Sequence, residues 1–556
     1  MVIEEINKIL NNTIKEYNLS VKKSNVVDYQ CDDLFRLAKE EKKSPQILGE
    51  EIVAKINDMD DFDEYFKEVV FCHPGFINFT LSDSFINKLL VKMNESPKFG
   101  LKLPKEETYV IDYGGPNIAK PLHVGHMRPA IVGESIKRII KYFGQKVISD
   151  VHYGDFGLQI GEVIYGIKKH NISISDLTLA DLNTIYPEIS TLCKENEEVK
   201  EECAKITKDL QDGNLEYDKY YQKILELSLS DIKRIYKYLD VDFDLWYGEM
   251  DSRKYMNGVE EVLKSKNLLE ISEGASVINV SEVTDQKELP PLIFKKSNGA
   301  YLYGSTDMAT IYQREQDFHP DYILYVTDLR QKLHFEQVFR ASLKSGITDA
   351  KLEHLGFGTI NGTDGKPYKT RSGETPRLDT LFADVKEIFC SSKESNKDMS
   401  EDDIKKIVNA ILKFADLQNN RDRDYIFDIN KFSNVVGKTG PYMLYTYLRL
   451  NKIIDSEKSS DKLSNIIYNV VDRNLRLKIL ELDEALNKAF VDRMPSYIAD
   501  YIYDLAIQAN NFYQNNHINS CSDALNKADW LYIINLTKNI IKEMLSLIVI
   551  DVPTIM

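Results

Sequence analysis

The stretch Pro116-Asn117-Ile118-Ala119-Lys120-Pro121-Leu122-His123-Val124-Gly125-His126 decides the fold, because it places an HxGH sequence between a predicted strand and a predicted helix. Apolar residues from Tyr109 to Tyr113 predict a buried strand before it, and helical periodicity runs from Val124 to Phe143, where Gly144 ends it. The two histidines therefore stand on the first helical turn and point to one side. Backbone amides of such a turn favour phosphate groups, which indicates a nucleotide site.

A second apolar segment, Gln145 to Val151, follows the helix and predicts another strand. Residues 108–152 thus give strand, loop, helix and strand, the half-unit of a Rossmann-type doubly wound parallel sheet. Ligands of such sheets bind beyond the carboxyl ends of the strands, where the loop with His123 lies. Gly125 lets a nucleotide approach the backbone. Without this context, an accidental pair of helix-capping histidines would be the ordinary interpretation of HxGH.

Length, charge and cysteine spacing limit the class of protein. A chain of 556 residues is too long for one core and predicts about three or four domains. With 71 basic and 87 acidic side chains the net charge is −16, which argues against indiscriminate binding to nucleic acid or anionic membranes. The six cysteines show no CxxC spacing, so we expect reduced thiols and no zinc cluster. Neither an apolar run of about 18 residues nor a signal peptide is evident, so we expect a cytoplasmic protein without a membrane segment.

The chain divides into three predicted domains. Residues 1–104 form a small α+β domain with a helix from Glu4 to Tyr17, a strand from Phe76 to Leu81 and a linker near Lys102-Leu103-Pro104-Lys105. Residues 105–390 form the Rossmann domain, with an acidic, helix-rich insertion of little strand character at about 167–295. Residues 400–556 are all helical, with apolar faces at Asp402 to Gln418, Asn430 to Asp455, Lys462 to Ala489, Pro495 to Tyr513 and Ala524 to Ile548.

Four further blocks follow PNIAKPLHVGH in order: HYGDFGLQ (152–159), SNGAYLYGSTD (297–307), YVTDLRQKLHF (325–335) and DGKPYKTRSG (364–373). Together these blocks closely resemble the class I arginyl-tRNA synthetases. The resemblance begins at DYQC (28–31) and PGFINF (74–79) and continues through TGPY (439–442) to DLA (504–506). It implies an arginine–tRNA ligase that makes arginyl adenylate and pyrophosphate from arginine and ATP, then transfers arginine to the 3′ end of tRNA(Arg). It also implies an N-terminal domain that contacts tRNA and a C-terminal domain that binds the anticodon.

The resemblance assigns catalytic and ATP-binding roles to His123, Gly125, His126, Lys120, Lys369 and Arg371. Donors beside the α-phosphate suit the reaction, because attack by a carboxylate builds negative charge there. In place of the usual KMSKS loop the chain has Lys369-Thr370-Arg371-Ser372-Gly373, which lacks the second lysine. Lys120 is the substitute cation that the resemblance puts forward, and its loss should slow adenylate formation more than tRNA binding. A solvated basic loop remains the alternative for Lys369 and Arg371.

By resemblance, the arginine pocket consists of Asp112, Asn117, His123, Tyr303, Asp307 and Gln331. A guanidinium needs planar acceptors away from water, and we expect Asp307 to supply them while Tyr303 closes over the substrate. Lysine, as a competing substrate, could not satisfy such a fork-shaped site, so the pocket would reject it without an editing site. Ordinary roles stay open: strand packing for Tyr303, turns or caps for the two aspartates, and a helix start for Gln331.

Predicted tRNA contacts are Phe76 and Asn78 in the N-terminal domain and Tyr445, Arg449 and Met556 in the helical domain. A stacking aromatic beside an amide suits a base edge, yet strand packing explains Phe76 and Asn78 nearly as well. Tyrosines at every third or fourth position near Tyr445 are also typical of a helix core. Mg²⁺ is expected with ATP, and no protein metal site is predicted. We expect a monomer, and we expect arginine activation to wait for tRNA because the KTRSG loop is degenerate.

Two other functions fit parts of the sequence. A silent relative that binds tRNA or senses arginine would lack pyrophosphate exchange, although both histidines, the pocket acids and Lys120 are present. Another HxGH nucleotidyltransferase, acting on a small metabolite, would need neither the N-terminal domain nor the helical domain.

Overall fold

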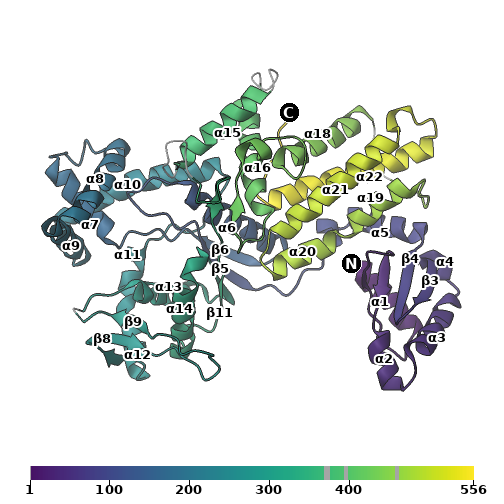
Figure 1. Ribbon diagram of the computed structural model, residues 1–556, viewed down its shortest axis with the longest axis horizontal. Coiled ribbons are helices and arrows are strands. Elements are labelled where there is room, and N and C mark those ends of the chain that lie inside the picture. Colours follow the sequence, from purple (N-terminus) through teal and green to yellow (C-terminus); the bar gives the residue numbers. More distant parts are fainter. Residues whose placement is uncertain (1, 298, 369–375, 393–398, 458–461) are drawn as a thin grey trace.

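A four-stranded parallel sheet in the order β11-β10-β5-β6 forms the centre of the molecule (Figure 1). The computed structural model describes residues 2–297, 299–368, 376–392, 399–457 and 462–556. Helix α6 (Val124–Tyr142) connects β5 to β6, so the predicted strand, loop, helix and strand are confirmed. The sheet consists of β5 (Thr108–Tyr113), β6 (Lys146–Asp150), β10 (Tyr322–Val326) and β11 (Lys351–His354). The prediction of a Rossmann-type parallel sheet is therefore correct.

The N-terminal region is an antiparallel sheet in the order β1-β2-β4-β3, covered by helices. Strand β4 (Phe76–Leu81) lies where it was predicted, whereas α1 (Val2–Thr13) ends before Tyr17. It ends early because the Asn11 side-chain amide bonds both backbone groups of Leu19 and turns the chain back. The remaining elements are β1 (Lys22–Lys23), β2 (Tyr29–Cys31), β3 (Phe66–Cys72), α2 (Leu34–Glu41), α3 (Pro45–Asn57), α4 (Phe62–Tyr65) and α5 (Asp83–Glu95).

The insertion has a helical part and a sheet part. Its helical part projects to the left in Figure 1 and comprises α7 (Leu158–Lys169), α8 (Leu179–Glu195), α9 (Glu197–Gln211) and α10 (Leu215–Tyr238). After α11 (Glu249–Ser252) and α12 (Met256–Ser265) comes a three-stranded antiparallel sheet of β7 (Glu270–Ser272), β8 (Ala275–Ile278) and β9 (Leu292–Lys295). The prediction of little strand character was wrong here. These strands have three or four residues, and β7 is exposed along its length, so none of them shows a clear apolar alternation.

Helices make up the C-terminal region, with two corrections to the predicted boundaries. The predicted helix 430–455 is two helices, because Thr439 caps a new helix by accepting a bond from the amide of Tyr442. The predicted helix 462–489 begins only at Val470, where Asn469 is the cap, and breaks after Leu480. The helices after the sheet are α13 (Tyr303–Phe318), α14 (Lys332–Ser345), α15 (Leu378–Ser392), α16 (Glu401–Leu417), α17 (Ile429–Phe432), α18 (Gly440–Ser456), α19 (Val470–Leu480), α20 (Leu482–Val491), α21 (Ser496–Asn515) and α22 (Ala524–Leu547). A short parallel pair, β12 (Ile360–Asn361) and β13 (Tyr425–Ile426), joins the catalytic and helical regions.

The N-terminal region packs against the C-terminal helices, below α19 in Figure 1. Arg473 of α19 donates two bonds to the Asp28 carboxylate, at 2.7 and 3.0 Å, and Arg476 donates to Asn87 of α5 at 2.6 Å. The two predicted tRNA-contacting regions thus form one side of the molecule. The six cysteine thiols are free, as expected. Among the described helices, none has the length and apolar character needed to cross a membrane.

The end of the last helix, α22, is bonded to the helix that begins with the HxGH histidines. On α6, Ser135 Oγ donates to the Leu547 carbonyl at 2.8 Å and Arg138 donates to the Ser546 carbonyl at 3.0 Å. On α16, the buried Lys413 Nζ donates to the Val549 carbonyl at 2.7 Å. These three bonds attach the C-terminal end of α22 and the residues just after it to α6 and α16.

Lys413 predicts a dependence of stability on pH. Burial lowers its pKa to about 7, so between that pH and its ordinary value the unfolded chain binds more protons than the folded one. Stability contributed by this site therefore rises with pH across that window. We compare the unfolding free energy of the wild type with that of Lys413→Met at each pH. The difference should shift in favour of the wild type by about 2 kcal/mol between pH 7 and pH 9, as followed by thermal midpoints. Lys405→Met on the same helix is the control, and parallel pH profiles for wild type and Lys413→Met would contradict the assignment.

Candidate active site

A cavity of about 530 Å³ lies at the carboxyl ends of β5 and β10. Residues from distant parts of the chain line it, and they include the predicted site residues Asp112, His123, Gly125, His126, Asp307 and Gln331. The HxGH turn and the acidic residue Asp307 therefore face one space. This position is where ligands bind in open parallel sheets.

The two histidines hold each other in place on the first turn of α6. The His123 side chain accepts a bond from the Gly125 amide at 3.1 Å, and His126 Nδ1 accepts from the His123 amide at 3.1 Å. The ring centroids are 4.0 Å apart. This reciprocal arrangement satisfies two amides of the helix N-terminus and fixes both rings, as a capping box does.

Gly125 is required by the position of the His123 ring. A Cβ atom at this position would lie 2.9 Å from His123 Cε1 and 3.0 Å from Nδ1. Any side chain would therefore push the ring away and break its bond to the Gly125 amide. The glycine thus leaves room for the His123 ring.

Both histidines are neutral at physiological pH. Burial and the nearby Lys120 lower the pKa of His123, while burial and His123 lower the pKa of His126 to about 3. Since both Nδ1 atoms accept bonds from amides, each neutral ring carries its proton on Nε2. The site therefore offers two N–H donors to a phosphate.

The opposite part of the cavity is acidic. Asp307 lies on the first turns of α13, and its Oδ2 is 2.5 Å from His334 Nε2. Burial lowers the pKa of His334, but the Asp307 carboxylate outweighs it and raises that pKa. Tyr303, 60 % exposed on the same helix, has a pKa raised by burial and then by Glu249 and Asp307. Tyr303 is thus influenced by both acids, although it is not among the residues that line the cavity.

Glu249 is a cavity residue that the sequence did not suggest. The chain returns from the insertion to the edge of β6 through bridges from Asp150 to Leu245 and from Tyr153 to Gly248, and this brings Glu249 to the cavity. Burial raises its pKa to about 7, His152 opposes this, and Asp307 adds to it. No local pattern distinguishes Glu249 from the many other acids of the insertion. Glu249 reaches the cavity only because Leu245 and Gly248 pair with Asp150 and Tyr153.

Asp112 shares a buried network with Arg314, Asp150 and His152. Arg314 Nη2 donates to Asp112 Oδ2 at 2.6 Å and to Asp150 Oδ2 at 2.8 Å. Burial lowers the pKa of His152, but Asp150 and Asp112 outweigh it and raise the value to about 9. The ligand atoms of Asp112, Asp150 and His152 lie close enough to hold a cation. The Arg314 guanidinium, however, already donates to one oxygen of each carboxylate. These residues therefore do not fit a resident metal.

Four predicted residues either do not line the cavity or fall outside the described part of the chain. Lys120 Nζ lies 4.7 Å from the ring centre of Tyr186 on α8 and also influences Glu162 and both histidines. Asn117 pairs with Gly154 and is not among the residues that line the cavity. Lys369 and Arg371 fall outside the described residues.

The described residues on the two sides of the KTRSG stretch lie at the cavity and on the HxGH turn, respectively. On the upstream side, Pro367 and Tyr368 line it. On the downstream side, the Pro376 carbonyl accepts from the Val124 amide at 3.0 Å, and the Leu378 amide donates to the Leu122 carbonyl at 3.0 Å. Residues 376–378 are thus bonded to the HxGH turn.

The predicted tRNA residues of the N-terminal domain differ in their surroundings. Phe76 packs edge to face on the exposed Phe35, with ring centres 5.7 Å apart. Asn78 is buried, and its amide bonds Gln30 and Cys72. An aromatic pair is therefore available at this surface, whereas the Asn78 amide is engaged inside the sheet.

In the helical domain, the structure places Tyr445 and Arg449 together on α18. Arg449 donates to the Tyr445 hydroxyl at 2.8 Å and to Asn510 at 2.9 Å, and its guanidinium lies over the rings of Tyr445 and Tyr513. Tyr513 of α21 was missed by the sequence analysis because it belongs to a different helix. Met556 packs against the core with part of its surface exposed.

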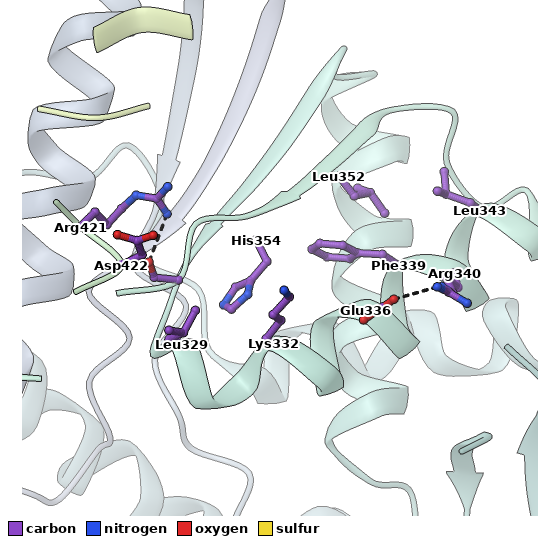
Figure 2. A pocket seen from close by; sticks show the side chains of 11 residues that line it. Leu329, Lys332, Glu336, Phe339, Arg340, Leu343, Leu352, His354, Arg421 and Asp422 are labelled. Carbon is purple, nitrogen blue, oxygen red and sulfur yellow. Dashed lines mark hydrogen bonds and ion pairs between the residues drawn. The ribbon is translucent and has the colours of Figure 1, made fainter. Parts of the chain in front are cut away.

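A second cavity, of about 510 Å³, lies between α14 and β11 (Figure 2). Its walls combine Phe339, Leu343 and Leu352 with His354 and Lys332, whose side chains lie near each other in Figure 2. Burial, followed by Arg421 and Lys332, lowers the pKa of His354 to about 4. This cavity contains none of the predicted site residues, so the cavity at the HxGH turn is the candidate active site.

Sequence comparisons match the whole of this architecture. Residues 86–429 match the family described as tRNA synthetases class I (R), catalytic domain. Residues 443–556 match the DALR anticodon binding domain, and residues 1–81 match the arginyl tRNA synthetase N terminal domain.

Named relatives agree with these matches. An arginine–tRNA ligase of Alkaliphilus oremlandii is 41 % identical over 551 residues, which cover 94 % of this chain and 93 % of that one. One from Agathobacter rectalis is 37 % identical over 95 % of this chain and 93 % of that one. Among solved structures, the arginyl-tRNA synthetase of Plasmodium falciparum has a TM-score of 0.82 at 25 % identity, covering 100 % of this chain and 99 % of that one. The Thermus thermophilus arginyl-tRNA synthetase shares the fold, with a TM-score of 0.82 at 20 % identity and complete coverage of both chains.

Proposed function

Because the chain belongs to the class I arginyl-tRNA synthetases, we propose that the cavity between the HxGH turn and Asp307 is where it joins arginine to tRNA. The protein is an arginine–tRNA ligase: it activates arginine with ATP to arginyl adenylate and pyrophosphate, then transfers arginine to the 3′ end of tRNA(Arg) for protein synthesis. The observation that carries the site assignment is that His126 and Asp307 line one cavity.

His123 and His126 act at the nucleotide end. The arginine carboxylate attacks the α-phosphorus of ATP, a new O–P bond forms, and the bond to the bridging oxygen breaks, so pyrophosphate leaves with the electron pair. Negative charge that builds on the α-phosphate meets the Nε2–H donors of both neutral rings. Because Gly125 and the capping bonds fix the rings beforehand, the donors need no rearrangement during the reaction.

Asp307 and Glu249 act at the guanidinium end. Two carboxyl groups beside a tyrosine provide planar acceptors for a fork of N–H donors. The pKa of Glu249 is about 7 in the free site, and a guanidinium beside it favours the ionised form. Asp112, Asn117 and Gln331 orient the other end of the substrate.

Lys120, Lys369 and Arg371 supply positive charge for the leaving pyrophosphate. Support for Lys120 comes from its electrostatic influence on both histidines. Support for the KTRSG residues comes from the flanks of that stretch, which lie at the cavity and on the HxGH turn. Without a second lysine this loop is poorly equipped to act alone, so activation waits for tRNA.

Residues 1–104, 105–390 and 400–556 are the tRNA-contacting, catalytic and anticodon-binding domains of this proposal. Phe76 stacks on a base of the tRNA, and Asn78 supports the strand that carries it. Tyr445 and Arg449 meet anticodon bases as a stacking platform, with Met556 nearby. Mg²⁺ arrives with the phosphates of ATP, for which the described residues provide no separate cage. The enzyme acts as a monomer in the cytoplasm, where protein synthesis uses its product.

Pyrophosphate exchange tests the function directly. With arginine, ATP and tRNA(Arg), labelled pyrophosphate should enter ATP, and without tRNA the rate should fall to near background. Lysine in place of arginine serves as the control and should give no exchange. Absence of exchange by a folded protein that binds tRNA would favour a silent relative. Strong exchange without tRNA would refute only the dependence on tRNA.

A further inference from the structure

Three neighbouring strands present a row of side chains at the floor of the active-site cavity. Tyr325 of β10, Asp112 of β5 and Asp150 of β6 are register partners across the sheet. In parallel strands, partners in register point to the same face. The row therefore brings two carboxyl groups side by side in the interior, where each is strongly disfavoured as an unpaired anion.

Arg314 of α13 spans this row. Its side chain is 2 % exposed, its guanidinium lies 5.2 Å from the ring centre of Tyr325, and one nitrogen, Nη2, donates to both carboxylates. A terminal guanidinium nitrogen has two hydrogens, one for each carboxylate. Among the described residues, Nε and Nη1 of Arg314 have no partner, so these two bonds and the ring contact account for its interactions.

Asp112 is therefore held through one oxygen only. Its Oδ2 accepts from Arg314, while the residue itself lines the cavity. Burial raises the pKa of the Asp112 carboxyl, and the Arg314 guanidinium opposes this. Arg314 thus fixes the direction of the carboxylate and favours its ionised form, leaving Oδ1 for a ligand.

We infer that Arg314 is a positioning residue for the substrate: through its bond to Asp112 it prepares the carboxylate that receives the α-ammonium group of arginine. This inference rests on the proposed function of the cavity. The acids Asp307 and Glu249 attract the guanidinium, so the ammonium is the cationic group of the substrate left for Asp112. Arg314 itself does not touch the substrate.

Ligand truncation separates this role from a structural one. Arginine and 5-guanidinopentanoate, which lacks only the α-amino group, are compared as substrate and competitive inhibitor in tRNA charging. Arg314→Met should raise the KM for arginine about 10- to 100-fold, because Asp112 loses both its direction and its compensating charge. The inhibition constant of 5-guanidinopentanoate and the KM for ATP should change less than about threefold.

Arg314→Lys is the conservative variant, and it allows the same comparison to be made if Arg314→Met fails to fold. Lysine keeps the compensating charge but is shorter and lacks the planar fork, so the KM for arginine should rise about three- to tenfold, again with little change for the analogue. Arg340→Met on α14, where the arginine pairs with Asp285 and Glu336 near the second cavity, is the matched control and should leave both ligands unaffected.

The possible outcomes are distinct. Equal weakening of arginine and the analogue in either variant would overturn the inference, since general damage to the pocket affects both. An unchanged KM for arginine in Arg314→Lys and Arg314→Met would overturn it as well. If the wild type neither charges tRNA nor binds arginine, the proposed function itself fails.

Discussion

Replacing His126 with alanine is expected to lower the rate of arginine-dependent pyrophosphate exchange by about 10²- to 10³-fold, the usual effect of removing one prepared donor to a developing oxyanion. The loss has two sources in the structure. The Nε2–H donor disappears, and the His123 amide loses the Nδ1 atom to which it donates at 3.1 Å. Since His123 depends on that turn for its own position, both donors are weakened together.

His126→Asn tests this explanation because asparagine combines an acceptor and a donor in one amide. It can cap the His123 amide while presenting an N–H group, so its exchange rate should lie between those of the wild type and the alanine variant. His170→Ala, which removes a surface histidine paired with Glu188, should keep the wild-type rate. A rate for His126→Ala within about threefold of the wild type would remove His126 from the proposed mechanism.

Asp307→Ala is expected to raise the KM for arginine about 30- to 1000-fold while changing the KM for ATP little, since removing one partner of a desolvated charge pair costs about 2 to 4 kcal/mol. The guanidinium loses a carboxylate at the acidic end of the cavity, and His334 loses its partner at 2.5 Å. Without that carboxylate, the imidazole no longer has the group that raises its pKa. The HxGH turn makes none of these contacts, so we expect the KM for ATP to change little.

Asp307→Asn keeps the shape and removes the charge, so its KM for arginine should lie between those of the wild type and the alanine variant. Asp317→Ala, an exposed position on the same helix, is the matched control. Steady-state charging at saturating tRNA gives both constants. An equal rise in the KM for arginine and for ATP would show that Asp307 supports the whole cavity instead of the guanidinium.

The sheet and the HxGH turn could be predicted because their signals are local. Residues 109–113, 124–143 and 145–151 carry strand and helix patterns that tertiary contacts leave unchanged. The breaks near Thr439 and Asn469 were missed because apolar periodicity continues past a polar cap. Strands β7 to β9 were missed because strands of three or four residues are too short to show a pattern.

Residues that act through distant contacts could not be predicted in the same way. Glu249 reaches the cavity only because the chain returns from the insertion to the edge of β6. Arg314 of α13 contacts Asp112, Asp150 and Tyr325 on three neighbouring strands, which no local stretch reveals. Tyr513 joins Arg449 across two helices. Each depends on which elements become neighbours, and that information is spread over the whole chain.

The bonds from Ser135, Arg138 and Lys413 to the end of α22 have a mechanical consequence for how tRNA could control the reaction. Helix α6 has 19 residues, a rigid rod of about 28 Å, with His126 near one end and Ser135 and Arg138 farther along it, whereas Lys413 lies on α16. No flexible loop separates the anchors from the histidines. A rotation of α22 on tRNA binding would therefore move the first turn of α6, and with it His123 and His126.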